Sequence, residues 1–190
     1  LGDKASKLRG SSYAYRLSGR YGNRDTEYLY EYWFNAYCYY MRKARDSARN
    51  YLNGAILKVD IQSFYTKIIQ DQLCNELSRE LTVSERVRWL IRLLLSKDID
   101  EHDLGQGISQ GSLGSGFYSN IYLTSVDTKF GNGNEWGVEL HRYVDDMILV
   151  IPNSEDIDTV EETLKAELSV LGLNLNDSKT EKIDVPTFLG

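Results

Sequence analysis

The stretch His-Arg-Tyr-Val-Asp-Asp-Met-Ile-Leu-Val-Ile, residues 141–151, decides the fold that we expect for this chain. Two adjacent carboxylates, Asp145 and Asp146, lie between segments that have the composition of buried strands, and Pro152 ends the second segment. Acidic side chains at the turn of a buried hairpin are costly unless a positive group meets them. Mg²⁺ and Mn²⁺ prefer such closely spaced oxygen ligands. The alternative is a solvated hairpin turn, in which Asp is common.

A further acid, Asp60, ends the short strand-like segment 55–60, and helical spacing follows it. Open α/β layouts place ligand-contacting groups at the end of a buried strand. Phosphoryl transfer between nucleotides uses two metal ions about 3.5–4 Å apart. Asp60 with Asp145 and Asp146 is therefore a candidate ligand set for such a pair. Asp60 also suits a helix N-cap, and the two roles are compatible.

A glycine-rich loop is the third element. It contains Gly107, Gly111, Gly114 and Gly116, and the segment 117–123 after it reads as a helix. Backbone N–H groups of such a loop can hold phosphate or sugar. The alternative is that the glycines only form tight turns.

These three elements, in this order, resemble the palm of reverse transcriptases. Residues 57–65 (Leu-Lys-Val-Asp-Ile-Gln-Ser-Phe-Tyr) resemble the first catalytic motif, residues 109–111 (Ser-Gln-Gly) the second, and residues 143–146 (Tyr-Val-Asp-Asp) the third. Residues 171–181 and 188–190 (Phe-Leu-Gly) agree with two further motifs. The motifs cover the chain from about residue 55 to its end.

Within that family the chain resembles prokaryotic enzymes, namely those of group II introns, retrons and abortive-infection or defence systems. The resemblance lies in residues 119–123 (Ser-Asn-Ile-Tyr-Leu) and 175–180 (Leu-Asn-Asp-Ser-Lys-Thr). Many relatives carry Ser-Pro where this chain has Ser115-Gly116, which favours the defence-associated branch. We therefore expect a role in antiviral defence.

The resemblance implies the metal ligands. Asp60 and Asp145 would bind the ions, Asp146 would be a further ligand or orienting group, and the backbone carbonyl of Ile61 would join them. Two Mg²⁺ ions are the implied cofactor, with Mn²⁺ as the alternative. Lys179 matches a lysine that protonates the departing pyrophosphate or steadies its charge. An exposed loop lysine is the alternative reading.

The resemblance also implies the substrate contacts. Tyr65, with Phe64 beside it, matches a steric gate under the sugar of the incoming nucleotide, which would select deoxynucleotides. An ordinary buried aromatic residue is the alternative. Gln110 would hydrogen-bond the nucleotide or the template base, with Gly111 giving it space, and Arg16 would contact the triphosphate.

Composition indicates a cytoplasmic globular protein. The chain has 190 residues, 42% of them hydrophobic, and it contains no apolar run long enough for a membrane span and no signal peptide. Cys38 and Cys74 are too few for a disulfide framework or a zinc site.

Charge is unevenly distributed. Residues 1–50 hold 10 Lys or Arg and 5 Asp or Glu, a balance of +5, whereas the remainder holds 12 and 23, a balance of −11, which together give the net −6. The basic part is where a polymerase would place the fingers that meet template and triphosphate.

Residues 28–40 are crowded with aromatic side chains. Helical spacing places Tyr30, Phe34, Tyr37 and Met41 on one face. Two interpretations follow: an amphipathic helix that packs on the palm, which we favour, and a platform on which bases stack.

We therefore predict an α+β fold: a polymerase palm, with a split βαβ (ferredoxin-like) antiparallel sheet and helices on one face, plus partial fingers and no thumb. The expected division is residues 1–54 as partial fingers and residues 55–190 as palm, with a fingers-like helical insertion at about 82–105. The expected elements begin with a strand at 55–60 and a helix at 64–80. A further helix follows a capping box at 82–85, and others are expected at 113–129 and 157–171. A hairpin at 137–151 and two short final strands complete the prediction.

The predicted activity is that of an RNA-directed DNA polymerase core, which adds deoxynucleotides to a primer 3′-hydroxyl by two-metal phosphoryl transfer. Its partners would be an RNA template, a primer strand and dNTPs, with no membrane partner. The alternatives are untemplated or protein-primed DNA synthesis of the abortive-infection type, and an inactive palm that serves as an RNA- or protein-binding scaffold. The sequence leaves the oligomeric state open.

Overall fold

The computed structural model describes residues 11–16, 30–81, 84–96, 105–111, 114–131 and 133–190. Its centre is a four-stranded antiparallel sheet in the order β2-β3-β1-β4. The strands are β1 (Ala55–Asp60), β2 (Glu139–Tyr143), β3 (Asp146–Ile151) and β4 (Glu181–Asp184). The α-helices in the described ranges are α2 (Trp33–Ala48), α3 (Phe64–Lys67), α4 (Gln70–Leu81), α5 (Glu85–Ser96), α6 (Ser115–Tyr122), α7 (Thr124–Lys129), α8 (Ile157–Val170) and α9 (Val185–Leu189). This strand order is that of the split βαβ unit, so the predicted α+β palm is confirmed.

The two central strands send alternate side chains to opposite faces of the sheet. Ile56 of β1 and Val150 of β3 belong to a core cluster with residues of α2 and α9. Leu57 and Leu149 belong to the other cluster, with residues of α4, α6, α7 and α8. Even-numbered residues of β1 and β3 therefore face α2. The same alternation sets the face of the sheet to which the acidic side chains at the strand ends project.

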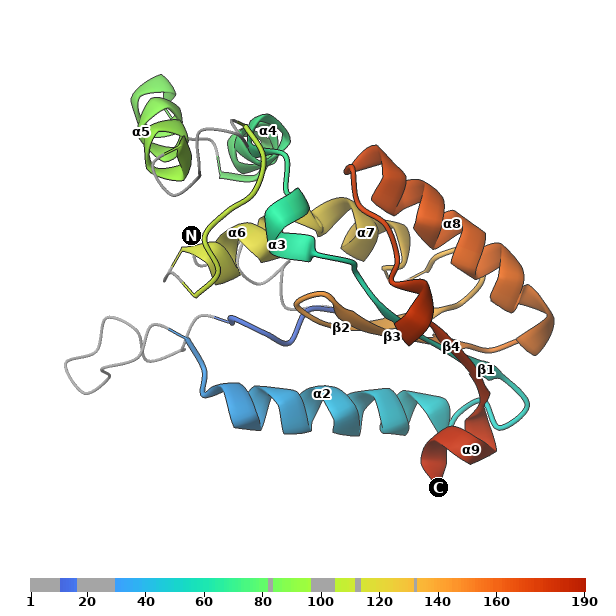
Figure 1. Ribbon diagram of the computed structural model, residues 1–190. Coiled ribbons are helices and arrows are strands. Elements are labelled where there is room, and N and C mark those ends of the chain that lie inside the picture. The colour runs from blue at the N-terminus through green and yellow to red at the C-terminus, as the bar shows by residue number, and fades with distance from the viewer. Residues whose placement is uncertain (1–10, 17–29, 82–83, 97–104, 112–113, 132) are drawn as a thin grey trace.

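Helices cover both faces of the sheet. Figure 1 shows α2 crossing one face, whereas α6, α7 and α8 lie on the other. We expected the palm helices on one face, which holds for α6, α7 and α8, but α2 and α9 cover the second face. β1 and β3 are buried along almost their whole length, which explains why they read as nearly continuous apolar runs.

The helix α2 packs on the sheet, but through a different face from the one we predicted. Its buried residues are Ala36, Tyr40, Ala44, Ser47 and Ala48. The small side chains let the helix approach the sheet closely, and the larger aromatic side chains of the predicted face are left at the surface: Phe34 is 52% exposed and Tyr37 41%. Of the predicted face, Phe34 therefore does not pack on the palm, whereas the ring of Tyr37 contacts that of Tyr143 and Met41 packs against the core cluster.

The helix predicted at 64–80 is broken into α3 and α4. Between them, Ile69 forms a β-bridge with Gln106, and the carbonyl of Ile68 accepts a hydrogen bond from the Gly107 N–H at 2.7 Å. These contacts with a distant loop take backbone groups that the helix would use, so the helix stops and restarts. The helix α5 begins after Ser84, whereas Thr82 and Val83 of the predicted capping box lie outside the described residues.

The end of the chain also differs from our expectation. Instead of a second short strand, residues 185–189 form α9, whose first turn contains Pro186 and is capped by the Asp184 side chain, which accepts from the Thr187 N–H at 2.7 Å. Proline is favoured in the first turn of a helix and cannot donate in a sheet. A local N-cap therefore outweighs the apolar pattern here.

Two expectations from composition can be compared with the structure. Cys38 is an exposed free thiol and Cys74 a buried one. Of the helices in the described ranges, none is both long and apolar enough to cross a membrane.

His141 lies at the centre of a buried polar chain between β2 and α2. Its Nδ1 is 2.9 Å from the Tyr13 hydroxyl, and its Nε2 is 2.9 Å from the Ser47 hydroxyl. Ser47 in turn donates to Glu139 Oε2 at 2.6 Å, so Nε2 is the protonated nitrogen of a neutral ring. Burial lowers the pKa of His141 to about 4; Glu139 opposes this shift and Lys43 adds to it.

Stability should therefore fall between pH 7 and 4.5 in part through His141. The folded-state pKa of His141 lies below its unfolded value, so between the two values only the unfolded chain binds a proton at this residue. Stability is therefore lost as pH drops below about 6.5. We expect the free energy of unfolding, measured in urea, to drop by about 2–3 kcal/mol more in the wild type than in His141→Gln, which keeps one donor and one acceptor. An equal drop in both proteins would contradict this role.

Candidate active site

The sheet brings three carboxylates to one place. Asp60 at the end of β1 is the register partner of Asp146 at the start of β3, and both are even-numbered, so both project to the face that α2 covers. Asp145 occupies the turn before β3, and its carbonyl accepts from the Ile61 N–H at 3.3 Å. Val144, the other turn residue, has φ +60, a left-handed conformation that favours a tight reversal between β2 and β3. The predicted hairpin with acids at its turn is confirmed.

The electrostatics of this group resist three negative charges. Burial raises the pKa of Asp145 to about 6, with smaller contributions from the neighbouring charges of Asp146 and Asp60. Burial and the charge of Asp60 also raise the pKa of Asp146. A bound cation would favour the ionised form of these carboxyl groups and would offset their mutual repulsion.

One cation of the protein already lies against these acids. Lys179 Nζ is 3.1 Å from Asp60 Oδ2, and this contact raises the pKa of the Lys179 amine. The side chain of Asn176 donates to Asp60 Oδ1 at 3.1 Å, and the Asn176 N–H donates to the Asp60 carbonyl at 2.8 Å. Asn176 thus fixes Asp60 at two points. We had not assigned it a role, although it stands in the Leu-Asn-x-x-Lys-Thr segment that we had singled out.

The donor set fits a hard divalent cation in its chemistry. Carboxylates of Asp60, Asp145 and Asp146 are the oxygen ligands that Mg²⁺ takes, and the raised pKa values of Asp145 and Asp146 mark a shortage of positive charge. In the described ranges, no three His, Cys, Asp or Glu side chains are grouped as a preformed metal cage. Mg²⁺ sites commonly use one or two carboxylates together with substrate phosphates, so such a cage is not required.

Phe64 and Tyr65 follow the first acid. Phe64 is 2% exposed and lies in the core, where it anchors the segment and does not line the site. Tyr65 is only partly buried, its ring centroid lies 5.3 Å from that of Phe64, and its hydroxyl makes side-chain hydrogen bonds with Tyr15 and Ser119. Burial raises the pKa of Tyr65, with smaller contributions from Tyr15 and Asp145, so this phenol is a neutral group.

The glycine-rich loop contacts the segment that carries Tyr65. The Ile108 N–H donates to the Tyr65 carbonyl at 2.9 Å, and Gly107, with φ +84, makes the turn that allows this approach. Gln110 and Gly111 follow directly and are exposed. The contact with Tyr65 is thus made by Ile108, two residues before Gln110, and nucleotide contact by Gln110 and Gly111 stays a prediction.

Arg16 occupies a different setting from the one we expected. Its Nε donates to the Ser12 carbonyl at 2.7 Å, and its guanidinium lies 4.4 Å from the centroid of the Tyr13 ring. It also lines a cavity of about 870 Å³ on the β2 and α2 side, together with Lys43 and His141. Contact with a triphosphate stays a prediction for Arg16.

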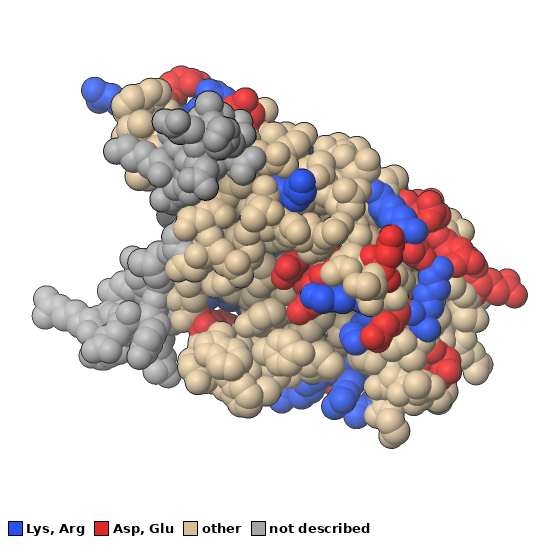
Figure 2. Space-filling model, in the orientation of Figure 1, with Lys and Arg blue, Asp and Glu red and all other residues tan. Residues whose placement is uncertain are grey.

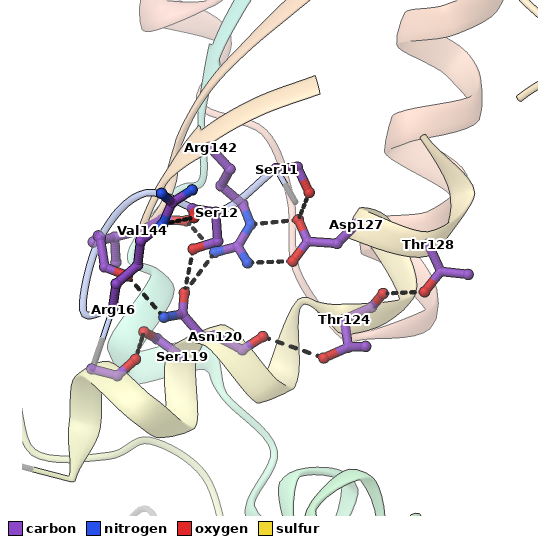
Figure 3. A network of polar contacts seen from close by, with 12 residues as sticks. Ser11, Ser12, Arg16, Ser119, Asn120, Thr124, Asp127, Thr128, Arg142 and Val144 are labelled. Atoms are coloured by element: carbon purple, nitrogen blue, oxygen red, sulfur yellow. Dashed lines mark hydrogen bonds and ion pairs between the residues drawn. The ribbon is translucent and has the colours of Figure 1, made fainter. Parts of the chain in front are cut away.

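A buried arginine that the sequence did not reveal supports the turn. Arg142, whose side chain is 0% exposed, forms a two-point ion pair with Asp127 and donates to the Val144 carbonyl at 3.1 Å. Figure 3 shows that Asn120 and Ser11 join the same network from α6 and the N-terminal segment. The network links Asn120 and Ser11 to Val144, the residue that precedes Asp145.

Gly116, the residue that departs from the Ser-Pro of many relatives, lies directly under the ring of Tyr15. A Cβ at position 116 would lie 2.2 Å from Tyr15 Cγ, closer than atoms can approach. Tyr15 itself has φ +51, which costs energy for a residue with a side chain, and its hydroxyl bonds to Tyr65. Only glycine leaves room for Tyr15 in this position.

Gly116→Ala should therefore destabilise the protein by about 1–3 kcal/mol, because the new methyl group collides with the Tyr15 ring. In an open helix the same change would stabilise by about 0.5–1 kcal/mol. Measuring the free energy of unfolding of both proteins shows whether the substitution destabilises or stabilises the fold. In a Tyr15→Ala background the loss should disappear, and a loss that persists there would show that the collision is elsewhere.

Comparison with known proteins agrees with this geometry. The family model described as reverse transcriptase (RNA-dependent DNA polymerase) matches residues 16–190. No curated protein matches the sequence. Similar solved structures include the apo telomerase of Candida tropicalis, with TM-score 0.65 and 15% identity over 96% of this chain and 35% of that one. Another is the Candida albicans telomerase in complex with the TWJ fragment of telomeric RNA, with TM-score 0.64 and 16% identity over 95% of this chain and 33% of that one.

The chain spans about a third of the length of these telomerases, and at such low identity the likeness shows the fold. The family match, by contrast, covers nearly the whole chain and includes every strand of the sheet. The chain therefore belongs to the reverse transcriptase family of nucleotidyltransferases.

Proposed function

We propose that this chain is the catalytic core of an RNA-directed DNA polymerase, in which Asp60, Asp145 and Asp146 hold two Mg²⁺ ions. One observation carries the proposal: Asp60 and Asp146 face each other across β1 and β3, Asp145 adjoins them, and Lys179 contacts Asp60 at 3.1 Å. When bound, the ions would make the attacking hydroxyl more acidic and stabilise the charge on the leaving pyrophosphate.

In the proposed reaction the primer 3′-oxygen forms a bond to the α-phosphorus of a dNTP, and the bond from that phosphorus to the β-phosphate oxygen breaks. The primer hydroxyl loses its proton, and pyrophosphate leaves. Lys179, which contacts Asp60 at 3.1 Å, would donate a proton or a charge-assisted hydrogen bond to the pyrophosphate. Asn176 keeps Asp60 in position throughout.

Sugar selection is assigned to Tyr65. The Phe64 ring lies 5.3 Å from the Tyr65 ring, centroid to centroid, and the Tyr65 hydroxyl makes hydrogen bonds with Tyr15 and Ser119. A ring fixed in this way cannot yield to a 2′-hydroxyl. Gln110, Gly111 and the Ile61 carbonyl complete the proposed nucleotide contacts.

Primer extension by the full-length protein on an RNA template tests the proposal. We expect template-directed product from dNTPs with Mg²⁺, no such product from Asp60→Asn, and preference for dNTPs over rNTPs. Tyr65→Ala should reduce this preference by on the order of 10²-fold, the range by which a pocket rejects an added hydroxyl.

The other outcomes of this assay separate the alternatives. DNA product whose sequence ignores the template would assign untemplated synthesis. RNA binding without any product would assign a scaffold. Assignment to the prokaryotic, defence-associated branch stays a prediction from the motifs and is tested by comparing phage resistance in cells that carry the wild type or Asp60→Asn.

A further inference from the structure

The start of α2 presents a cluster of aromatic side chains to solvent. We call Tyr32, Trp33, Phe34 and Tyr37 the aromatic cluster; their exposed fractions are 62%, 63%, 52% and 41%. The ring of Trp33 lies 5.9 Å from that of Tyr32 and 5.7 Å from that of Phe34. Contiguous exposed aromatic surface of this kind usually marks an interaction site.

Basic side chains continue from this cluster along the same helix. Arg42, Arg45 and Arg49, the arginine row, are exposed and line a groove of about 330 Å³ together with Tyr37 and Met41. The chain as a whole carries a net charge of −6, so this helix is an exception to its surroundings. Figure 2 shows Lys and Arg side chains along the lower edge of the molecule, over α2, whereas acidic side chains gather over α8.

The aromatic cluster is joined to the candidate active site by direct contacts. The hydroxyl of Tyr143 donates to the Trp33 carbonyl at 3.2 Å, and the rings of Tyr37 and Tyr143 meet edge to face at 5.3 Å. Tyr143 is in turn the register partner of Asp146. The cluster thus begins one residue pair away from the carboxylates, on the face to which they project.

We infer that the aromatic cluster and the arginine row form a binding track for a single strand of nucleic acid that enters or leaves the site. Aromatic rings stack with any base, and arginines neutralise phosphates. The distance from Trp33 to Arg49 along the helix is about 24 Å, the length of roughly seven stacked nucleotides. This inference rests on the proposed function, since the strand is the substrate of that same site.

A strand of nucleic acid fits this surface better than a protein segment does. An apolar protein segment would match the rings and offer no acceptor to Arg42 and Arg45, whereas an acidic segment would match these two arginines and leave the rings uncovered. Arg49 is already paired with Asp46 at 2.8 Å. A nucleic-acid strand supplies both bases and phosphates at regular intervals along its length, and α2 presents both rings and guanidinium groups along one helix.

Binding of fluorescein-labelled dodecamers, oligo(dT) in one arm and oligo(U) in the other, tests this track in the full-length protein carrying Asp145→Asn, so that turnover plays no part. We expect Trp33→Ala/Phe34→Ala to weaken Kd by about 5- to 100-fold. Arg42→Gln/Arg45→Gln should reduce the slope of log Kd against log salt by about 1.4, which is about 0.7 for each phosphate that an arginine no longer neutralises. The arm with the larger effect identifies the strand as DNA or RNA.

Matched controls exist elsewhere on the surface. Val170 on α8 is 73% exposed, and Lys165 lies on the same helix over the opposite face of the sheet, so Val170→Ala and Lys165→Gln should bind as the parent does. Unchanged binding by both α2 double variants would overturn the inference. The inference would also be overturned if the α2 double variants changed the oligomeric mass, measured by light scattering, and left binding unaltered. The surface would then be a contact between two copies of the chain. Failure of primer extension with α2-dependent binding intact would count against the proposed catalysis alone.

Discussion

Replacing Asp145 with asparagine is expected to abolish primer extension and, at the same time, to stabilise the metal-free protein. Removal of a metal ligand should cost at least about 10³-fold in rate, because bound ions contribute several kcal/mol of charge stabilisation to such a reaction. The gain in stability follows from the raised pKa of Asp145, about 6 against an ordinary value of 3.8. The folded protein holds the proton more tightly than the unfolded chain, so ionisation at neutral pH works against folding.

The size of that gain is limited by solvent. Asp145 is only partly buried, so we expect on the order of 1–2 kcal/mol at pH 7.5, less than the full pKa difference would give. Thermal unfolding in EDTA and in Mg²⁺ measures the effect. In EDTA the variant should melt above the wild type, and Mg²⁺ should raise the midpoint of the wild type alone.

Asp158→Asn serves as the control, because the Asp158 carboxylate lies on α8 and contacts Lys182, away from the site. It should leave extension unchanged and respond to Mg²⁺ as the wild type does. An Asp145→Asn protein that extends primers within about tenfold of the wild-type rate would rule out the proposed role of this acid.

Arg142→Met is expected to cost about 3–5 kcal/mol of folding free energy, the largest stability effect that we predict. The change leaves the Asp127 carboxylate, only 14% exposed, without its ion-pair partner, and it removes the hydrogen-bond donor to Asn120 Oδ1 and to the Val144 carbonyl. Denaturant unfolding of Arg142→Met and of Arg79→Met measures it. Arg79 is 59% exposed and also paired with an acid, yet its loss should stay within about 0.5 kcal/mol.

A double variant distinguishes ionic coupling from packing. Asp127→Leu should be costly alone, whereas Arg142→Met/Asp127→Leu should cost clearly less than the sum, because removing both partners leaves no unpaired charge. Additive losses would show that Arg142 acts through its volume. Arg142→Met protein that remains folded should also extend primers poorly, because the Val144 carbonyl, just before Asp145, no longer accepts the hydrogen bond from Arg142.

The hairpin that carries Asp145 and Asp146 could be predicted because the residues that specify it are adjacent in the sequence. Two apolar runs around Asp145 and Asp146 specify both strands, and the acids can only stand at the turn. The placement of Asp60 opposite Asp146 needs the strand order as well, which the family resemblance supplied and the sheet confirms.

Features that depend on distant contacts could not be read in this way. The break at Ile68 and Ile69 is set by a loop almost forty residues later, and the burial of Arg142 depends on Asp127. On α2 three alanines with Ser47 and Tyr40 face the sheet, and helical spacing alone cannot say which stripe of the helix is buried. The roles assigned to individual site residues stay predictions until the variants are measured.

The pairing of Asp60 with Asp146 has a consequence for how related chains can differ in length. One residue added within β1 or β3 would turn a carboxylate to the opposite face of the sheet, and two would move it about 6.6 Å along the strand. Insertions and deletions are therefore tolerable only in the connections, such as the long path from β1 to β2. Among homologues, the span from β2 to β3 should vary in residue type while its length stays fixed.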